Sequence, residues 1–566
     1  MEKELYASFY RKNRFRYIAG MFLVAVVTIL TLVYAYLLQV VLDAANQGQM
    51  ERIIYAIIVM TGLFLVLFLL QMLLKRIRCA FVRIAMSQYK SRAFEEITKK
   101  GITTFLSENT GSYLSVLTND AAYIEEHYLH VFFQIISMCV SFLGAIALML
   151  WYNWVMSLVS IAVCVLPIIL SILFGEKMAR AEKNISDKNE NYVGMIKDLL
   201  GGFSVIKSFQ AEKQAVALFE KENNELELLK EKSKNTKGTI TIISTEIGSV
   251  MQIVVFAVGA LLSIKGMITV GVVIAFVQLM NNIMEPIQAL PSLYADRKAA
   301  KALIRKQSDF FAGKEKDEGT CEISRLERAI TLNDVSFSYE EGSRVLKNIR
   351  YTFEKGKTYA IVGESGSGKS TLMNLLLKGY EDYQGEIYFD DVNLKQLSGS
   401  ALYRMVSVVQ QNVFIFNSSV QENITMFHAC EKERFEDAVH KAGLDKLVHE
   451  RGYKYLCGEG GANLSGGERQ RISIARSLLK DTSVLIMDEA TAALDAETSN
   501  NILNQILSLE GMTKIVITHR LEKNVLKQFD HIMVLRSGNI TESGTFDELM
   551  ERQQYFYSLY QISAGE

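Results

Sequence analysis

A glycine-rich stretch that ends in lysine and serine, Gly363–Thr371 (GESGSGKST), carries the clearest chemistry in this chain. It fits the pattern G-x-x-x-x-G-K-[ST], in which backbone N–H groups and a helix N-terminus cradle phosphate oxygens. The apolar run Thr358–Val362 predicts a strand before the loop, and Thr371–Lys378 predicts a helix after it. We expect Lys369 to reach the terminal phosphates of a nucleotide and Ser370 to hold Mg²⁺. The other loop residues expected to bind the nucleotide are Gly363, Glu364, Ser365, Gly366, Ser367, Gly368 and Thr371.

Two adjacent carboxylates follow a second apolar run, about 120 residues further along the chain. Ser483–Met487 (SVLIM) predicts a buried parallel strand that ends in Asp488 and Glu489. In an α/β sheet the C-terminal ends of the strands are where ligand chemistry is placed. Asp488 can hold Mg²⁺, and Glu489 can polarise the attacking water as a general base.

A second anion site is predicted between these two motifs. Leu464–Glu468 (LSGGE) places a serine and two glycines at the start of the basic helix predicted for Arg469–Lys480. A helix N-terminus of this kind binds anions. One chain with two anion sites, but only one lysine-bearing loop, indicates that the second site serves a nucleotide held by another copy.

The first half of the chain has long runs without charge, and 566 residues are enough for more than one domain. We expect a transmembrane domain over residues 1–300, a linker over 301–328, and a cassette domain with alternating strands and helices over 329–566. The six predicted spans are 17–42, 53–74, 131–150, 155–174, 240–264 and 268–285. The net charge of −1 gives no basic field for a nucleic acid, and the six scattered cysteines predict neither a disulfide framework nor a zinc site.

The basic residues are distributed unequally between the two sides of the predicted membrane domain. Eight lysines and arginines follow span two between Lys75 and Lys100, whereas the three opposite loops hold only Arg52 and Lys265. The positive-inside rule therefore predicts that both termini are cytoplasmic. The cytoplasmic loops have helical periodicity, so the spans are expected to continue as helices and to turn near 104–115 and 201–210. The expected location is a bacterial cytoplasmic membrane.

Few polar residues lie inside the predicted spans. Polar groups at that depth usually face the bundle interior or a water-filled path. The candidates for lining a substrate cavity are Gln252, Gln278, Asn281 and Asn282, and an equal alternative is that these amides join neighbouring helices. Glu246 is the one interior carboxylate, and we expect it at the cytoplasmic edge of the membrane.

These motifs, in this order, resemble an ATP-binding cassette (ABC) transporter of the exporter type: one membrane domain fused to one cassette. LSGGE followed by ERQRISIAR is the most specific part of the resemblance, which covers nearly the whole chain. NTGSYLSVLTNDAAYIEE and GGFSVIKSFQAE resemble the two cytoplasmic loops of exporters. Further matching residues are Tyr339 before the loop, Gln411 in VVQQNVFIF, Asp495 in AALD and His519 in ITHR. Ala492 departs from the usual serine.

The resemblance implies a fold and a mechanism. The fold is an α-helical six-span transmembrane domain with long cytoplasmic extensions, followed by an α/β P-loop ATPase cassette. Two cassettes close head to tail on ATP and Mg²⁺. Tyr339 stacks on adenine, Gln411 contacts Mg²⁺, and Glu489 and His519 complete hydrolysis. The residues implied to bind ATP in trans are Ser465, Gly466, Gly467, Glu468 and Asp495.

The expected function is ATP-driven export of an amphiphilic, lipid-like, drug-like or peptide substrate. The expected partner is a second half-transporter, which forms either a homodimer or a heterodimer with this chain in a lipid bilayer. Two alternatives remain open: an importer with exporter architecture, as in some siderophore carriers, and an ATP-binding regulatory or sensor subunit. A nucleic acid partner is not expected.

Overall fold

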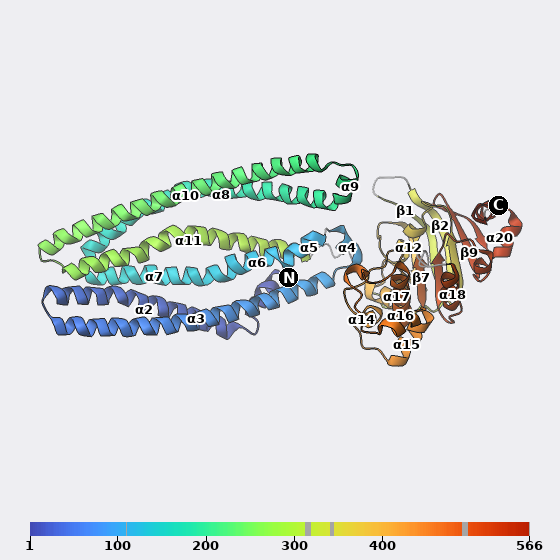
Figure 1. Ribbon diagram of the computed structural model, residues 1–566, viewed down its shortest axis with the longest axis horizontal. Helices are drawn as coiled ribbons and strands as arrows, with labels where there is room; N and C mark the ends of the chain where they lie inside the picture. The colour runs from blue at the N-terminus through green and yellow to red at the C-terminus, as the bar shows by residue number, and fades with distance from the viewer. Residues whose placement is uncertain (109, 312–318, 340–343, 489–495, 565–566) are drawn as a thin grey trace. The chain divides into compact units, whose positions relative to one another are not determined.

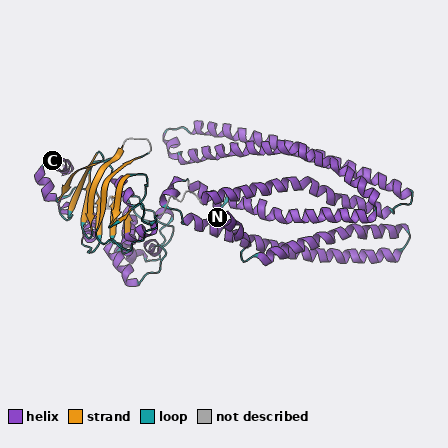
Figure 2. Cartoon of the chain, turned by 180° about the vertical axis from the view of Figure 1, so that it is seen from behind, coloured by secondary structure: helices purple, strands orange, loops and turns teal. Residues whose placement is uncertain are grey.

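The computed structural model describes residues 1–108, 110–311, 319–339, 344–488 and 496–564. It divides into two compact units, which are described separately (Figure 1). The first unit is Met1–Lys100 with Glu108–Gly313, and the second is Gly101–Ser107 with Lys314–Glu566. The described part of the first unit is helical, whereas the second contains the strands (Figure 2).

Long helices dominate the first unit. The longest run over 33 to 53 residues: α2 (Arg14–Asn46), α3 (Met50–Thr98), α8 (Trp154–Gly201), α10 (Glu212–Ile264) and α11 (Val270–Phe311). The shorter ones are α1 (Glu2–Tyr10), α5 (Thr110–Leu117), α6 (Asn119–Ile124), the π-helix η1 (Glu125–His130), α7 (Val131–Tyr152) and α9 (Phe203–Ser208).

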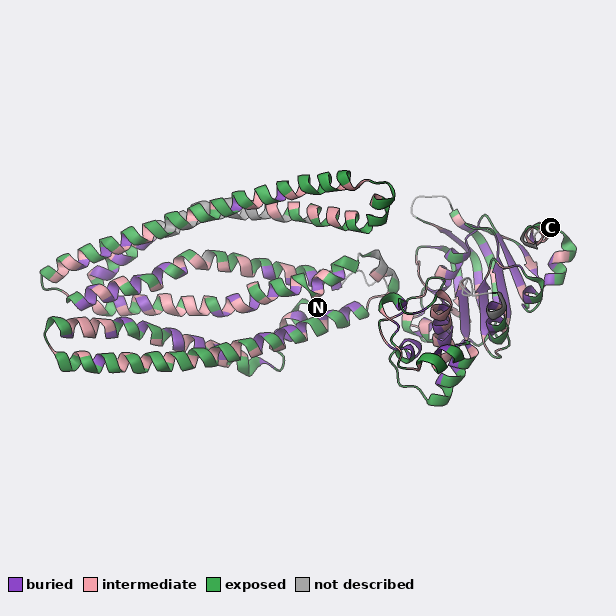
Figure 3. Ribbon diagram, in the orientation of Figure 1, coloured by how far each residue is buried: buried purple, intermediate pink, exposed green. Residues whose placement is uncertain are grey.

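Apolar composition and length show where the described helices can cross a membrane. Five helical segments qualify: α2, α3, the continuous run Thr110–Tyr152, α10 and α11. The shorter apolar segment Trp154–Cys164 opens α8, which contains the fourth predicted span, 155–174. Much of α3 is exposed (Figure 3). Phe64, Leu65 and Phe68 on this helix are each at least half exposed. Apolar side chains exposed on a span are suited to contact lipid.

The helices extend well beyond a bilayer, as the sequence predicts. At about 1.5 Å per residue, the 49 residues of α3 span roughly 74 Å, against a hydrocarbon core of about 30 Å. Both predicted turns contain short helices: α5 lies in the first and α9 in the second. The turn between α7 and α8 is set by Asn153, whose Oδ1 accepts hydrogen bonds from the backbone N–H groups of Val155 and Met156 at 3.0 and 3.1 Å.

The second unit contains two sheets. The order of the six-stranded sheet is β10–β9–β3–β8–β7–β6, and β9, β3, β8, β7 and β6 are parallel. Its strands are β3 (Thr358–Val362), β6 (Val406–Val409), β7 (Val484–Asp488), β8 (Thr513–Ile517), β9 (His531–Arg536) and β10 (Asn539–Gly544). The antiparallel sheet has the order β2–β1–β4–β5, with β1 (Ala329–Ser338), β2 (Arg344–Glu354), β4 (Gln384–Phe389) and β5 (Val392–Asn393).

Helices accompany the sheets in the second unit. Those before the LSGGE segment Leu464–Glu468 are α4 (Ile102–Ser107), α12 (Lys369–Leu376), α13 (Gly399–Met405), α14 (Val420–Thr425), α15 (Lys432–Lys441), α16 (Asp445–Arg451) and η2 (Glu459–Gly461). The later ones are α17 (Gly466–Leu479), α18 (Ala496–Leu507), α19 (Lys523–Leu526), α20 (Phe546–Arg552) and α21 (Tyr555–Ala564).

Strand β3 runs through the centre of the cassette core. Tyr359 and Ile361 pack into one apolar cluster, whereas Ala360 and Val362 pack into another. Successive side chains of a strand point to opposite faces, so these two clusters lie on the two faces of the sheet. Burial on both faces explains the uninterrupted apolar run that precedes the glycine-rich loop.

Candidate functional site

The glycine-rich loop leaves β3 and enters α12, as the motif requires. A Cβ on Gly363 would lie 2.2 Å from the carbonyl oxygen of Leu535 on β9, so only glycine fits there. Gly368 has φ of 104° and is the N-cap of α12. Because the helix starts at that cap, it begins at Lys369, two residues before its predicted start. The loop backbone and the helix N-terminus therefore form one continuous donor surface.

Lys369 lies inside this loop. Its side chain is buried, and Nζ donates hydrogen bonds to the carbonyl oxygens of Gly363 and Glu364 at 2.9 and 2.8 Å. These bonds hold a positive charge within the curve of the loop. The Ser367 hydroxyl is also buried and has no hydrogen-bond partner among the described residues. A buried cation and an unused hydroxyl in a glycine cradle fit a bound phosphate group.

Tyr339 lies beside the loop at the end of β1. Its hydroxyl is hydrogen bonded to the Thr371 hydroxyl at 2.9 Å, and the residue is 46% exposed. Phe337 and Tyr380 meet its ring nearly perpendicularly, at 85° and 87°. Since neither neighbour stacks parallel to the ring, the arrangement is compatible with a base stacking on Tyr339.

The carboxyl ends of adjacent strands bring the remaining cassette candidates to one edge of the sheet. Asp488 pairs in register with Ile517 of β8, and Ile517 pairs with Ile361 of β3. His519 follows β8 and Gln411 follows β6, the strand beside β7. Neighbouring strands lie about 4.8 Å apart. The phosphate loop, His519, Asp488 and Gln411 therefore follow one another along this edge, whereas Glu489 and Asp495 lie outside the described residues.

The LSGGE signature forms the start of α17. Ser465 is the N-cap: its hydroxyl accepts a hydrogen bond from the Glu468 N–H at 3.2 Å, and the Glu468 carboxylate accepts one from the Ser465 N–H at 2.7 Å. This capping box extends the helix back to Gly466, three residues before its predicted start. Ser465 is exposed, and its hydroxyl still has a proton to donate.

A groove of about 320 Å³ joins the signature to the loop after β6. It is lined by Gln411, Asn412, Val413, Phe414, Gly466, Arg469 and Gln470. Arg476 of α17 links this helix to the segment after β6, because its guanidinium donates hydrogen bonds to the carbonyl oxygens of Asn423 and Phe414. Burial lowers the pKa of this arginine. The contact couples the position of α17 to the segment that carries Gln411.

The four amide candidates of the membrane unit are joined by hydrogen bonds. Gln252 on α10 donates to Asn281 Oδ1 on α11 at 2.6 Å, and Ser141 on α7 donates to Asn282 Oδ1 at 3.1 Å. Asn282 also donates to the Gln278 carbonyl at 3.3 Å. Asn281 and Asn282 therefore both join helices, although Gln278 and Asn281 are also exposed. Interhelical bonding is observed for Gln252, Asn281 and Asn282, and cavity lining stays a prediction.

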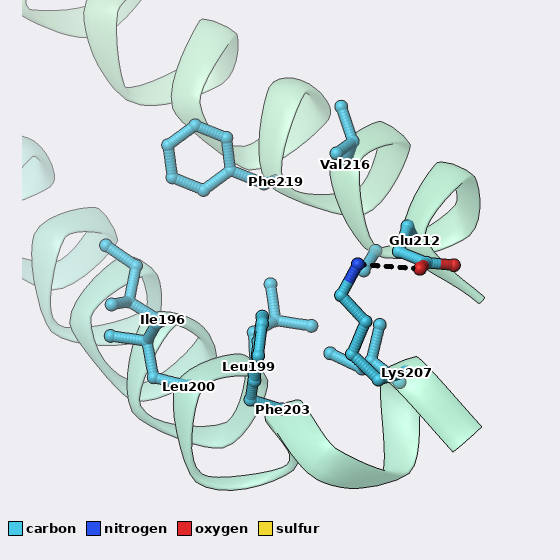
Figure 4. A pocket seen from close by; sticks show the side chains of 10 residues that line it. Ile196, Leu199, Leu200, Phe203, Lys207, Glu212, Val216 and Phe219 are labelled. Atoms are coloured by element: carbon cyan, nitrogen blue, oxygen red, sulfur yellow. Dashed lines mark hydrogen bonds and ion pairs between the residues drawn. The ribbon is translucent and has the colours of Figure 1, made fainter. Parts of the chain in front are cut away.

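The turn formed by α8, α9 and α10 carries an apolar pocket of about 390 Å³ (Figure 4). Figure 4 shows Ile196 and Leu199 of α8 facing Phe219 of α10 across it, with Lys207 paired to Glu212 at 2.9 Å. Phe203 and Phe209 at this turn are 56% and 79% exposed. Exposed aromatic residues gathered at one turn are typical of a protein contact surface.

Sequence reasoning missed two tyrosines near the loop. Tyr380 packs against Tyr339, whose hydroxyl raises the pKa of Tyr380. Tyr555 begins α21, and burial together with the neighbouring Glu364 carboxylate raises its pKa to about 12. No local motif marks either residue. Tyr380 lies outside the glycine-rich pattern, and Tyr555 is nearly 200 residues from the loop in sequence. The aromatic character of the segments 380–383 and 555–560 was the one available signal.

Comparisons with known proteins identify the family of each half of the chain. Residues 17–287 match the family described as ABC transporter transmembrane region, and residues 346–492 match the family described as ABC transporter. An uncharacterized ABC transporter ATP-binding protein, YwjA of Bacillus subtilis, is 32% identical over 84% of this chain and 83% of its own. The ATP-dependent lipid A-core flippase of Vibrio vulnificus is 30% identical over 85% and 83%.

A solved structure has the same fold over nearly the whole chain. It is a bacterial Atm1-family ABC exporter with ATP bound, with a TM-score of 0.87 over 98% of this chain and 100% of that one, at 22% identity. The two matched families occur here in one polypeptide, with the phosphate loop in the second. The chain therefore belongs to the ABC transporter family, as a transmembrane region fused to an ATP-binding cassette, and is an ATPase coupled to transport across a membrane.

Proposed function

We propose that this chain is half of an ATP-driven exporter, and that each ATP lies between the phosphate loop of one subunit and Ser465–Glu468 of another. The observation that carries the proposal is the edge of the six-stranded sheet, where the phosphate loop, His519, Asp488 and Gln411 follow neighbouring strands. An edge of this kind can hold a triphosphate and the groups that hydrolyse it.

The phosphate loop binds and orients the nucleotide. Loop N–H groups and Lys369 neutralise the phosphate oxygens, and Tyr339 stacks on the base. The hydroxyl of Ser370, the carboxylate of Asp488 and the amide oxygen of Gln411 form an oxygen donor set that fits Mg²⁺. When bound, Mg²⁺ supplies positive charge that offsets the negative charge of the phosphates.

Glu489 and His519 complete hydrolysis in this proposal. The Glu489 carboxylate accepts a proton from the attacking water, whose oxygen bonds to the γ-phosphorus as the bond to the ADP oxygen breaks. His519 contacts the γ-phosphate. From the second subunit, the Ser465 hydroxyl donates to the same phosphate, supported by Gly466, Gly467, Glu468 and Asp495.

The membrane unit supplies the cargo path and the connection to the cassettes. The exposed amides Gln278 and Asn281, with Gln252, favour a polar path along α10 and α11. The exposed apolar turn around α9 is suited to dock on a cassette, and α4 already belongs to the compact unit that contains the cassette. The loop charges favour cytoplasmic termini in a bacterial cytoplasmic membrane.

Export is favoured over import by the relatives. The lipid A-core flippases and the Atm1-family exporter share the order of the two domains with this chain, and these proteins are named for flipping and export. Transfer of an amphiphilic, lipid-like, drug-like or peptide cargo out of the cytoplasm or inner leaflet is the proposed activity. In reconstituted vesicles, transfer of cargo toward the side of the membrane on which the cassettes lie would support the importer instead.

The deciding experiment is Glu489→Gln in the purified full-length chain. The amide keeps the size of the side chain but cannot take the proton, so we expect ATPase activity to fall at least a hundredfold. ATP should then remain bound within closed dimers, as measured by retained labelled nucleotide and by size. Glu510→Gln, at an exposed carboxylate outside the site, is the matched control. ATPase activity near that of the control in Glu489→Gln would contradict the proposal.

A further inference from the structure

The phosphate loop carries one acidic side chain, that of Glu364. The backbone of this residue suits the loop, because its carbonyl oxygen accepts a hydrogen bond from Lys369 Nζ at 2.8 Å. Its exposed carboxylate does not, because the phosphate groups of a bound nucleotide are anionic and like charges repel. A group beside the loop that binds this carboxylate would reduce the repulsion.

The start of the loop lies against strand β9. Gly363 is so close to this strand that a Cβ on it would lie 2.2 Å from the carbonyl oxygen of Leu535. Because β3 and β9 are parallel, the chain leaves both strands at the same edge of the sheet. The next residues are Glu364 after β3 and Arg536 at the end of β9. The acidic side chain therefore starts next to the end of β9.

The C-terminal helix α21 reaches the same edge. Glu542 of β10 is 5% exposed, and its Oε1 accepts a hydrogen bond from the N–H of the fully buried Phe556 at 2.9 Å. This bond fixes the start of α21, whose first residue is Tyr555. The Arg536 guanidinium lies over the Tyr555 ring, 4.4 Å from its centroid. Tyr555 therefore lies beside the segment from which the phosphate loop leaves the sheet.

The Tyr555 hydroxyl is a buried donor with no bonded acceptor. Its oxygen is inaccessible to solvent and forms no hydrogen bond with any residue that the structure describes. Buried polar groups are nearly always hydrogen bonded, so an unpaired one needs an explanation. Burial and the neighbouring Glu364 carboxylate raise the pKa of Tyr555 to about 12. The hydroxyl therefore keeps its proton at neutral pH and is able to donate it in a hydrogen bond.

We propose that Tyr555 is a positioning residue for nucleotide binding, whose hydroxyl donates a hydrogen bond to Glu364 when phosphate groups occupy the loop. The negative charge of the phosphates drives the Glu364 carboxylate toward Tyr555, and a hydrogen bond to an ionised acceptor is strong. Arg536 adds positive charge on the same side. The inference rests on the nucleotide site of the proposed function and adds a residue of the C-terminal helix to it.

Three substitutions in the full-length protein test this role. The measurement is the affinity for adenylyl imidodiphosphate, a non-hydrolysable ATP analogue, with Mg²⁺ in detergent solution. Tyr555→Phe removes only the hydroxyl, and we expect it to weaken binding about threefold to tenfold, less than for a buried pair because Glu364 is exposed. The control is Tyr557→Phe on the same helix, where the hydroxyl accepts from Gln561 Nε2 at 3.0 Å. It should leave the affinity unchanged.

Rescue by Glu364→Gln separates positioning from a structural role. The neutral amide does not repel phosphate, so this variant should bind the analogue more tightly than the unmodified protein. Adding Tyr555→Phe to it should then have no further effect. The loss caused by Tyr555→Phe alone should also shrink as the salt concentration rises, because Glu364 is exposed and salt screens its charge.

The outcomes separate this proposal from the nucleotide site itself. Unchanged affinity in Tyr555→Phe would overturn the proposal, and so would an equal loss with Glu364 and with Gln at that position. In both cases the unmodified protein still binds the analogue, and the proposed function stands. Absence of binding by the unmodified protein would contradict the nucleotide site and with it both proposals.

Discussion

The carboxylate of Asp43, near the end of α2, accepts a hydrogen bond from the backbone N–H of Gly271 at the start of α11, at 3.0 Å. The same carboxylate accepts from the Thr269 hydroxyl at 2.8 Å and from the Gln39 amide at 3.2 Å. Asp43 therefore caps α11 from a helix that lies 228 residues away in sequence. A Cβ on Gly271 would lie 2.6 Å from Asp43 Oδ1, so glycine permits the contact.

Removing this cap should loosen the membrane unit. Asp43→Ala leaves the Gly271 N–H and the Thr269 hydroxyl without their acceptor, at a cost of about 1–2 kcal/mol. Gly271→Val should cost as much or more, because its side chain needs the space of Asp43. Thermal unfolding of the detergent-solubilised protein measures both effects, with Glu51→Ala as the control. Unchanged midpoints in both variants would show that the contact does not contribute to stability.

Tyr339 provides a test of how the nucleotide base is held. Tyr339→Phe removes the hydrogen bond to Thr371 but keeps the ring, whereas Tyr339→Ala removes the stacking surface. Stacking of a base on an aromatic ring is worth about 1–3 kcal/mol. We therefore expect the alanine variant to need roughly tenfold or more ATP for half-maximal hydrolysis, and the phenylalanine variant less than about threefold more. Equal effects of the two substitutions would assign the role to the hydroxyl instead.

Lys514 should make the cassette more stable as the pH rises. Its side chain is buried, and Nζ donates to the carbonyl oxygens of Leu507 and Leu509 at the end of α18. Burial lowers the pKa of this lysine from 10.5, against the opposing charge of Asp530. The unfolded chain therefore binds the proton more tightly, and stability rises with pH between the lowered pKa and 10.5.

Two variants test this role of Lys514 against the unmodified protein: Lys514→Met removes the buried amine, and Lys523→Met is the control. Residual ATPase activity after heating, followed from pH 7 to pH 10, measures each protein. Lys514→Met should be less stable at neutral pH, because two buried carbonyl groups lose a donor at about 1–3 kcal/mol each, and its stability should rise less with pH. Lys523 is exposed, so its variant should follow the unmodified protein. The same pH slope in all three proteins would exclude Lys514 as the source.

Local patterns predicted those parts of the fold that depend on a few neighbouring residues. The strand before the phosphate loop was predicted over Thr358–Val362, its observed limits, because burial on both faces leaves an uninterrupted apolar run. Helix limits were less accurate. Both α12 and α17 begin earlier than predicted, because Gly368 and Ser465 act as caps and the residues after them already have helical conformation.

Contacts between distant segments could not be predicted in this way. Nothing near Asp43 indicates that it meets Gly271, and nothing near Tyr380 indicates that it meets Tyr339. Gln252 and Asn281 were each identified as polar residues of a span, but nothing in the sequence indicated that the amide of Gln252 on α10 donates to Asn281 on α11.

Mixing of two inactive subunits tests whether the two halves of each ATP site come from different chains. Lys369→Ala removes the cation from the phosphate loop, and Ser465→Arg blocks the signature with a side chain too large for a helix cap. In a pair that contains one of each, one site carries both defects and the other carries none. Pairs isolated by two different purification tags should therefore recover up to about half of the unmodified ATPase activity.

A second mixture provides the control for this prediction. Lys369→Ala and Asp488→Asn both damage the half-site that contains the phosphate loop, so every site in a mixed pair keeps one defect and no recovery is expected. If each chain held a complete site, neither mixture would recover. Recovery of the first mixture alone requires Ser465 of one chain to act with Lys369 of the other. No recovery in isolated Lys369→Ala and Ser465→Arg pairs would contradict the shared site.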